Sequence, residues 1–350
     1  MDSGETKAES HNNTSYAVLL DPEGDVILVV ADQNILVSSV FSKMFGPDFS
    51  KGIQIRHGDR PCVNLEEDDP KAMESLLRIL HYQCADISFS MEPKPLAVLA
   101  IHCDKYNCIA ALRPWIAQWC SNHPGITAPE QFGYMLLAAY MFRSPIFSGL
   151  AAEATKQLAP GFVSVWEEHE TLALLPETIT ADALSEQITQ TLERLHQELQ
   201  STEGRLREQK ARYTMPGFVC VNCGRIHPDT AKKCHPCNNT DLFSRRCTSD
   251  YRVAEYFTIL RRCELWPSLE PFATLALSDL AFRFKCAQTD YKHQCGAKED
   301  CPLRRELELL SERVQWILKC IKGIPIEKGV EATHGRRHSL SHGHLPTVLG

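Results

Sequence analysis

The chain contains two CxxC sequences separated by ten residues, Cys220-Val-Asn-Cys223 and Cys234-His-Pro-Cys237. A CxxC turn presents two sulfur atoms to one ion, and zinc prefers four thiolate or imidazole ligands in a tetrahedron. Gly224 after the first pair and Asn238-Asn239 after the second permit the tight turns that such a site needs. Because the segment has few apolar residues, bound metal would supply folding free energy that a small core lacks. The pattern predicts a zinc-ribbon-like segment at 213–250.

All four positions of this motif are cysteine, so a bound zinc ion has no open coordination position for a reactive water. We therefore expect structural Zn²⁺ held by Cys220, Cys223, Cys234 and Cys237. None of the 15 cysteines lies between residues 121 and 219, and ten lie between Cys220 and Cys320. In a reducing compartment such clustering with CxxC spacing favours metal over disulfides. The alternative is a set of free structural thiols.

A second group consists of His293-Gln-Cys295 and Cys301, with Cys247 or Cys286 as a candidate fourth ligand. These residues can converge on one ion if the loop between helices predicted at 273–286 and 302–322 folds back. The alternative interpretation is that His293 lies at the surface and the cysteines are packing thiols, since cysteine is often simply buried. Spacing leaves both interpretations open; we include Cys247 in the second candidate site.

The composition is that of an ordinary soluble globular chain, with 43% hydrophobic and 23% charged residues. The first residues lack the basic start and apolar core of a secretory signal. Apolar runs such as 26–30 are too short to span a bilayer. We therefore expect a protein of the cytoplasm, the nucleus or both, with no membrane segment.

The charge is unevenly distributed. The chain carries a net charge of −7, yet the segment from Arg205 to Arg262 has twelve Lys/Arg against five Asp/Glu. A basic, cysteine-rich segment in an acidic protein supports a minority hypothesis of nucleic-acid binding, against the simpler interpretation of a solvated surface. The residues that would carry such binding are Arg225, Lys232, Lys233, Arg245 and Arg246.

The N-terminal half alternates strand and helix signals. Apolar runs at 25–30 and 35–37, separated by turn residues, predict a hairpin, and 62–65 predicts a further strand. Asp68 or Asp69 can cap a helix in which Pro70 takes the first position and Met73, Leu76, Leu77 and Leu80 repeat with helical spacing. Further helices are expected at 41–45, 95–106, 110–120, 131–142 and 148–158.

A long helix is expected from 181 to 213. Its apolar stripe contains Leu184, Ile188, Leu192, Leu195, Leu199 and Leu206, with Thr202 at one apolar place. The four-three rhythm lasts about three heptads, near the lower limit for a coiled coil. Packing against the protein's own body and a dimer zipper are both compatible with this pattern.

Five collinear blocks of the N-terminal half resemble the fungal type of BTB/POZ domain: DPEGDVILVV, ILVSS, VFSKMFGPDFSKG, VNLEEDDPKAMESLLRILHY and LAIHCDKYNCIAALRPWIAQWC. The resemblance covers roughly residues 16–120, and QFGYMLLAAYMF resembles the helices that often continue this domain. It implies a small sheet capped by helices that binds proteins, by self-association or, in some members, by recruiting a cullin ubiquitin ligase. Carried over, Asp25 would open the first strand, and Asp104, Lys105 and Tyr106 would end a helix packed on the core.

The chain departs from the family pattern at one place. Ser38-Ser39 runs directly into 40–45, where the family has a further helix of about two turns. Because that helix normally helps to form the partner surface, the departure weighs against self-association and cullin binding.

These patterns predict an α+β fold: a BTB/POZ-like sheet capped by helices, followed by a mainly α-helical region with a zinc-ribbon-like insert. The predicted division is a disordered leader at 1–15, a BTB/POZ-like domain at 16–123, a helical extension at 124–175, a long amphipathic helix at 176–212, the zinc-ribbon-like segment at 213–250, a helical Cys/His-containing region at 251–325 and a disordered tail at 326–350.

Enzyme motifs are missing from the sequence. There is no glycine-rich phosphate loop, GxSxG elbow, HExxH or nucleotide fingerprint, and His81, His102 and His169 fit satisfied surface or core positions. We therefore expect a non-enzymatic protein-protein interaction adaptor with structural zinc in its C-terminal half. The alternatives are a transcription-related regulator that contacts nucleic acid through the basic segment, or a ubiquitin-ligase substrate receptor.

Overall fold

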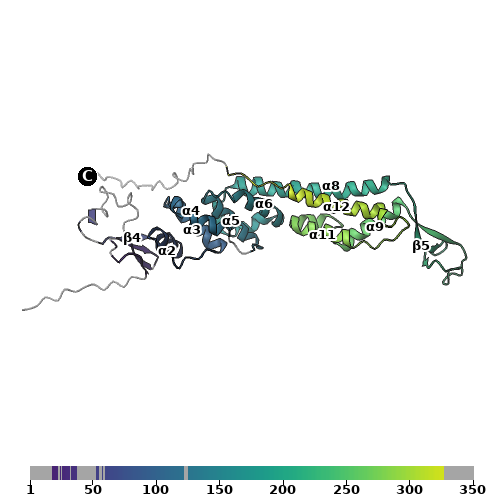
Figure 1. The fold of residues 1–350 in the computed structure, drawn as a ribbon, viewed down its shortest axis with the longest axis horizontal. Coiled ribbons are helices and arrows are strands. Elements are labelled where there is room, and N and C mark those ends of the chain that lie inside the picture. Colours follow the sequence, from purple (N-terminus) through teal and green to yellow (C-terminus); the bar gives the residue numbers. More distant parts are fainter. Residues whose placement is uncertain are drawn as a thin grey trace, which may run out of the picture.

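The protein has an α+β fold, as predicted, with a four-stranded and a three-stranded sheet among helices. The computed structural model describes residues 18–22, 24, 26–31, 33–37, 53–54, 57, 60–121 and 125–326. The molecule is elongated, with the first sheet near one end, a three-stranded ribbon at the other and helices between them (Figure 1). The leader at 1–15, Asp25, the Ser38-Ser39 junction, the helix predicted at 41–45 and the tail beyond 326 lie outside the described residues.

The four-stranded sheet contains the predicted hairpin and the predicted strand at 62–65. Strands β2 (Val26–Val30) and β3 (Gln33–Val37) pair antiparallel, and β4 (Cys62–Leu65) pairs parallel with β2. The short strand β1 (Val18–Leu19) lies parallel on the other side of β3, so the order is β1-β3-β2-β4. Because β2 is a run of β-branched and aliphatic residues inside the sheet, most of its side chains are buried.

Helix α2 (Pro70–Leu80) begins as predicted, with Pro70 in the first turn and Asp69 as the cap. The Asp69 carboxylate accepts the backbone N–H of Ala72 at 2.8 Å, which satisfies one of the free donors at the helix start. Met73, Leu76 and Leu77 have no exposed surface. Their spacing is the one that the sequence showed, so the amphipathic pattern sets the buried face.

A bundle of helices completes the first core. It contains α3 (Pro93–Lys105), α4 (Ile109–Ser121), α5 (Pro129–Met141), α6 (Phe147–Gln157) and α7 (Phe162–Glu167), followed by 3₁₀ turns at Glu170–Leu174. Helix α5 is buried on all sides from Phe132 to Ala139, which agrees with its almost wholly apolar sequence. Buried residues from Leu20 to Ile188 form one hydrophobic cluster.

Helix α8 (Glu186–Glu208) continues from a π-helical stretch at Thr178–Ser185. Most of its apolar stripe is buried within the chain itself, in contact with α9 (Ser249–Arg262) and α12 (Pro302–Lys319). Thr202 is fully buried at its expected place in the stripe. The stripe therefore packs against the protein's own helices, which is the first of the two interpretations of its sequence.

A second core holds the C-terminal half. Buried residues from Leu195 to Leu318 link α8, α9, α11 (Leu277–Thr289) and α12, while α10 (Leu269–Thr274) lies between α9 and α11. After α12 the chain returns to the first core, where Ile324 and Ile326 pack. No helix in the described part of the chain is both long and apolar enough to cross a bilayer.

Candidate metal centres

The first centre lies at the far end of the ribbon, which is formed by β5 (Tyr213–Cys220), β6 (Ile226–His227) and β7 (Leu242–Cys247) in the order β6-β5-β7. Its four predicted cysteines come together. The sulfur of Cys220 lies 3.4 Å from that of Cys237, and the sulfur of Cys223 lies 3.4 Å from that of Cys234. A tetrahedron with zinc–sulfur bonds of about 2.3 Å requires sulfurs about 3.8 Å apart. The four sulfurs, all within 4.8 Å of one another, can therefore hold one ion.

The predicted turns shape this centre. Gly224 and Asn238 adopt positive φ angles of 68° and 54°, which glycine and asparagine tolerate best. The amide of Gly224 donates to the carbonyl of Cys220 at 2.9 Å, and the amide of Cys234 donates to the carbonyl of Asn239 at 2.8 Å. Each CxxC pair is thus held by local backbone bonds, which explains why its spacing could be recognised in the sequence.

The thiols of the first centre have opposite tendencies to ionise. The backbone N–H of Asn239 and the neighbouring thiols lower the pKa of Cys237 to about 6, while burial raises the pKa of Cys234 to about 12. Four thiolates this close repel one another, so full ionisation requires a cation among them.

The second centre lies at the base of the ribbon, where it meets the helices. It joins Cys247 at the end of β7, His293 and Cys295 on the loop between α11 and α12, and Cys301 at the start of α12. Their ligand atoms all lie within 4.8 Å of one another. The structure decides between the two candidates for the fourth position, because Cys247 belongs to this group and Cys286 does not.

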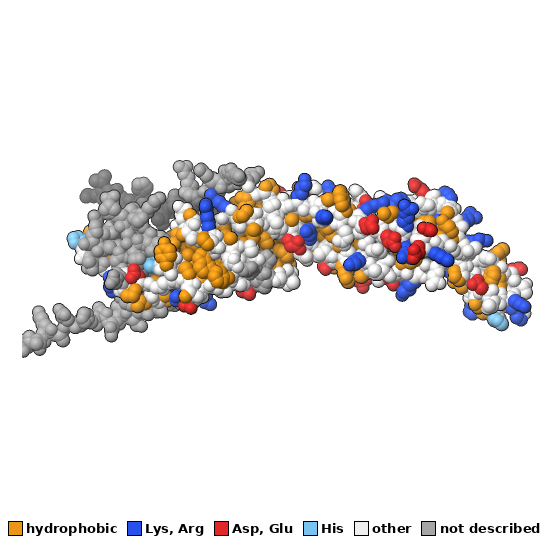
Figure 2. All heavy atoms as spheres, in the orientation of Figure 1, with side chains coloured by type: hydrophobic (Ala, Val, Ile, Leu, Met, Phe, Trp, Pro, Cys, Tyr) orange, Lys and Arg blue, Asp and Glu red, His pale blue; other side chains and the backbone are white. Residues whose placement is uncertain are grey.

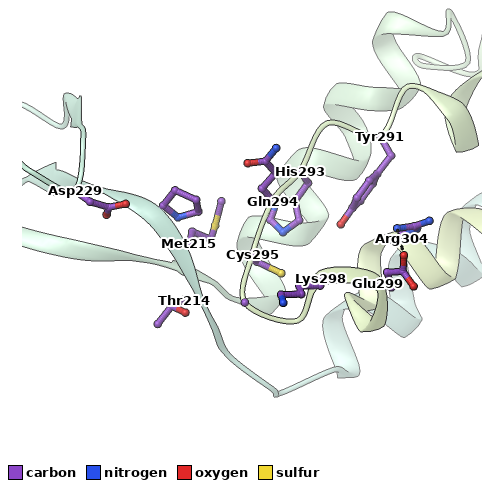
Figure 3. Close-up of a pocket in the computed structure, with 12 residues that line it drawn as sticks. Thr214, Met215, Asp229, Tyr291, His293, Gln294, Cys295, Lys298, Glu299 and Arg304 are labelled. Atoms are coloured by element: carbon purple, nitrogen blue, oxygen red, sulfur yellow. Dashed lines mark ion pairs between the residues drawn. The ribbon is translucent and has the colours of Figure 1, made fainter.

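His293 is buried, with 7% of its surface exposed, so the interpretation of this histidine as a surface residue is wrong. Its ring centroid lies 5.5 Å from that of Tyr251 and 5.9 Å from that of Tyr291. His293 and Tyr291 both appear in Figure 3. Neither ring nitrogen has a hydrogen-bond partner among the described residues. A buried imidazole without a hydrogen-bond partner lowers the free energy of unfolding. Coordination of an ion by one ring nitrogen would reduce that loss of stability.

The second centre also contains a residue that the sequence did not single out. Arg252 is completely buried, and its guanidinium donates to the carbonyls of Ala211 and Cys247 at 3.1 and 3.2 Å and to the Cys247 sulfur at 3.5 Å. In the described part of the chain no carboxylate forms an ion pair with it. Since a buried cation needs a counter-charge, the cysteine sulfurs are its natural partners. Three thiolates, a neutral imidazole and one divalent ion together carry a charge of about −1.

Cys301 is the most readily ionised of these thiols. The adjacent Cys247 thiol, together with the Leu303 backbone at the start of α12, lowers the pKa of Cys301 to about 3. The same contact with Cys301, together with burial, raises the pKa of Cys247. A helix N-terminus favours a thiolate, so α12 prepares Cys301 for metal binding.

The ribbon connects the two centres. Cys220 of the first centre pairs with Leu242 across β5 and β7, and Cys247 of the second pairs with Tyr213 at the other end. The five-residue rise along β7 separates the two ends by about 17 Å. The loop of the second centre is itself attached to the ribbon, because the Gly296 amide donates to the Thr214 carbonyl at 2.7 Å.

A cavity of about 700 Å³ opens beside the second centre (Figure 3). Three of its charged residues have internal partners: Arg304 pairs with Glu299, and Asp229 accepts the amide of Gly217 at 2.7 Å. Arg304 also pairs with Glu308. His293 and Cys295 contribute to its wall. The cavity therefore borders the second centre on the side of these two ligands.

Fewer basic residues of the segment from Arg205 to Arg262 are free to bind nucleic acid than the sequence suggests. Arg205 pairs with Glu306 and Arg262 with Asp290, while Arg252 is buried. Arg245 donates to the Pro216 carbonyl and the Tyr251 hydroxyl, both at 3.1 Å. The residues of the minority hypothesis that remain exposed are Arg225, Lys232, Lys233 and Arg246.

In the N-terminal half, the end of α3 forms a buried polar network. Lys105 pairs with the buried Asp68 at 2.7 Å, and the Tyr106 hydroxyl also donates to Asp68. His102 accepts the Asp69 amide on Nε2 at 2.9 Å, so its Nδ1 donates to the Val98 carbonyl at 2.8 Å. His102 is the satisfied core histidine that we expected, and the residues at the end of this helix have structural roles.

Comparison with protein-family models, curated proteins and solved structures finds no match to this chain. The class of protein is therefore defined by its own geometry: an α+β protein with two four-ligand candidate metal centres, one of four cysteines and one of three cysteines and a histidine.

Proposed function

We propose that this protein is a non-enzymatic protein-binding adaptor whose C-terminal half is held in shape by two structural zinc ions. The observation that carries the proposal is that each centre offers four thiolate or imidazole ligands within 4.8 Å of one another. Four protein ligands complete a tetrahedral zinc site and leave no position for a reactive water.

Zinc is the metal that these ligands suit best. Thiolate ligands select zinc, copper(I) or iron–sulfur chemistry over magnesium or calcium, and four-cysteine and three-cysteine-one-histidine sets are typical of structural zinc. Arg252 supports the assignment for the second centre, because its buried charge would compensate the net negative charge of that site. The first centre would supply the folding free energy that a ribbon of so few buried residues needs.

The adaptor role rests on the N-terminal half and on the exposed rings that it presents. This half has a small sheet followed by helices, and the BTB/POZ-like resemblance of its sequence implies a protein-binding module. Tyr82 is 93% exposed, and Phe89, which is 61% exposed, stacks on Trp115 with ring centroids 5.3 Å apart. Exposed aromatic residues of this kind are enriched where proteins bind one another. We infer that the partners are proteins, met in the cytoplasm or nucleus, where cysteines stay reduced.

Metal analysis of the purified full chain tests the zinc assignment. We expect two zinc ions per chain, one for each centre, by elemental analysis and native mass spectrometry. Replacing zinc with cobalt should give the intense visible absorption of tetrahedral thiolate sites, and this spectrum should not change when azide or cyanate is added. A chain without zinc, or a cobalt site that binds these anions, would contradict closed structural sites.

The adaptor role has its own test. Cross-linking mass spectrometry on the chain in cells should give cross-links from the α2–α4 surface to a small set of partner proteins. The double variant Tyr82→Ser/Phe89→Ser should lose them, while Phe282→Ser, which removes a similarly exposed ring from α11, should not. Stoichiometric cullin among the partners would narrow the role to a ubiquitin-ligase receptor, and catalytic turnover by the purified chain would overturn it.

A further inference from the structure

An apolar row crosses one face of the ribbon. Ile226 of β6, Val219 of β5 and Phe243 of β7 are direct neighbours in the register of the three strands. Side chains at paired positions lie on the same face of a sheet. Ile226 is 61% exposed and Phe243 is 67% exposed, while Val221, just beyond the end of β5, is 54% exposed. The ribbon therefore presents a continuous apolar row to the outside.

The row is not covered by the rest of the described chain. The ribbon projects from the end of the helical bundle (Figure 1), and hydrophobic and basic side chains lie together on its surface (Figure 2). A small segment with few apolar residues would be expected to bury them. Large apolar side chains that are exposed side by side on such a segment mark an interaction surface.

Most of the exposed charged residues of the ribbon are basic. Arg225, Lys232, Lys233 and Arg246 are exposed, and none forms an ion pair with another described residue. Of the two acidic residues in the ribbon, Asp229 already accepts the Gly217 amide. However, four thiolates and one zinc ion at the first centre carry about −2, so the metal-bound ribbon is only weakly cationic. This balance suits a partner with a few carboxylates better than a polyanion.

We propose that this row is a docking surface for an acidic, amphipathic helix of a partner protein. The inference rests on the proposed function, of which it names the second binding surface and the partner chemistry. The row spans two strand spacings, or about 10 Å. Helical residues at i and i+7 are also about 10 Å apart, so the apolar stripe of a helix can cover Ile226, Val219 and Phe243 together. A strand added beside β7 would meet only Phe243.

Nucleic acid fits the same surface less well. Base stacking needs aromatic platforms, and Phe243 is the one aromatic residue in a row that is otherwise aliphatic. Sequence-independent binding to phosphates would also need more basic residues than remain beside the anionic centre.

The test uses the zinc-loaded full chain and a displayed library of random peptides of about 16 residues, long enough for about four helical turns. We expect selected peptides to carry apolar residues at helical spacing with Asp or Glu beside them. Fluorescence anisotropy should show at least a tenfold weaker affinity for Ile226→Ser/Phe243→Ser. Lys232→Gln/Lys233→Gln should weaken binding several-fold and reduce its dependence on salt. The control Trp316→Ser, which removes a ring that is 66% exposed on α12, should bind unchanged.

Three results would overturn the inference: no selected peptides, selected peptides without acidic residues, or peptides that bind Ile226→Ser/Phe243→Ser as well as the unchanged chain. The surface would be assigned to nucleic acid instead if a labelled single-stranded oligonucleotide bound more tightly than the selected peptides. That binding should fall steeply with salt and be lost in Ile226→Ser/Phe243→Ser. Zinc content is measured for every variant. A chain that keeps its zinc but binds no peptide contradicts this inference alone, whereas a chain without zinc contradicts the proposed function.

Discussion

The guanidinium of Arg252 lies 3.5 Å from the sulfur of Cys247, and no part of the Arg252 side chain is exposed. This contact links a buried cation to a cluster of thiols that can ionise fully only around a metal ion. The charges of the two are complementary, because a three-thiolate zinc site carries about −1 and the guanidinium +1. The arginine and the metal should therefore depend on each other.

Replacing Arg252 by Met should weaken metal binding at the second centre about 10- to 100-fold, the usual effect of losing a partner that supports a ligand. Competition with a coloured chelator measures the affinity. Arg246→Met, which removes an exposed arginine of β7, is the matched control and should keep its metal. Equal retention of both ions by the two variants would show that Arg252 has no part in the centre.

His293→Ala should reduce the metal content from two ions to one, because it removes one ligand of the second centre. His293→Cys should restore the second ion by supplying a fourth thiolate. His235→Ala, which removes an exposed histidine next to Cys234, should retain both ions. Elemental analysis and the cobalt spectrum distinguish these outcomes, and two ions in His293→Ala would exclude His293 as a ligand.

Removal of zinc by a strong chelator should unfold the ribbon and leave the first core intact. The ribbon depends on its two centres, whereas the core from Leu20 to Ile188 contains neither. Hydrogen exchange should therefore rise sharply in β5 and β7 and stay slow in α3 and α5. Uniform loss of protection along the chain would show instead that the two halves unfold as one unit.

Gly323→Ala should destabilise the protein by about 1–3 kcal/mol, the typical cost of overpacking. A Cβ there would overlap the backbone oxygen of Ser148 on α6, and that oxygen can shift only if the helix backbone moves. Gly204→Ala in α8 is the control, since nothing lies within 4 Å of its Cβ position and alanine favours helix. Urea denaturation should show the first variant below the unchanged protein and the second at or above it.

Two adjacent aspartates should differ in their effect on stability. Asp69→Ala removes a helix cap and should cost about 1 kcal/mol. Asp68→Ala should cost about 3 kcal/mol, because it leaves Lys105, Tyr106 and His102 facing an empty buried position. Denaturant titrations of both variants give the two free energies of unfolding, and an equal cost for both would contradict a specific buried network.

Much of the fold followed from patterns between near neighbours. The Asp69 cap, the Pro70 start and the helical spacing of Met73, Leu76 and Leu77 all act within three turns of chain. The two CxxC turns depend on residues next to them, Gly224 and Asn238 among them. Local geometry of this kind is encoded in adjacent residues, so the first centre and most helices could be predicted from the sequence alone.

The second centre could be predicted only in part. His293, Cys295 and Cys301 are close in sequence. Their fourth partner comes from the end of β7, which is separated from them along the chain by α9, α10 and α11. Their spacing in the sequence made Cys247 and Cys286 equally good candidates for the fourth ligand. Cys247 reaches the site only because the base of the ribbon packs against the helices. The same holds for the stripe of α8, whose partner helices lie far along the chain.

Short-range spacing and backbone preference were therefore enough to predict most of the described helices, the hairpin and the closely spaced ligands. The tertiary structure alone decided the choice of Cys247, the burial of Arg252 and His293, and the alignment of Ile226, Val219 and Phe243 across the ribbon. Each of these depends on strand register or on contact between distant elements, where the free energy of burial and charge pairing is shared by residues that no local pattern connects.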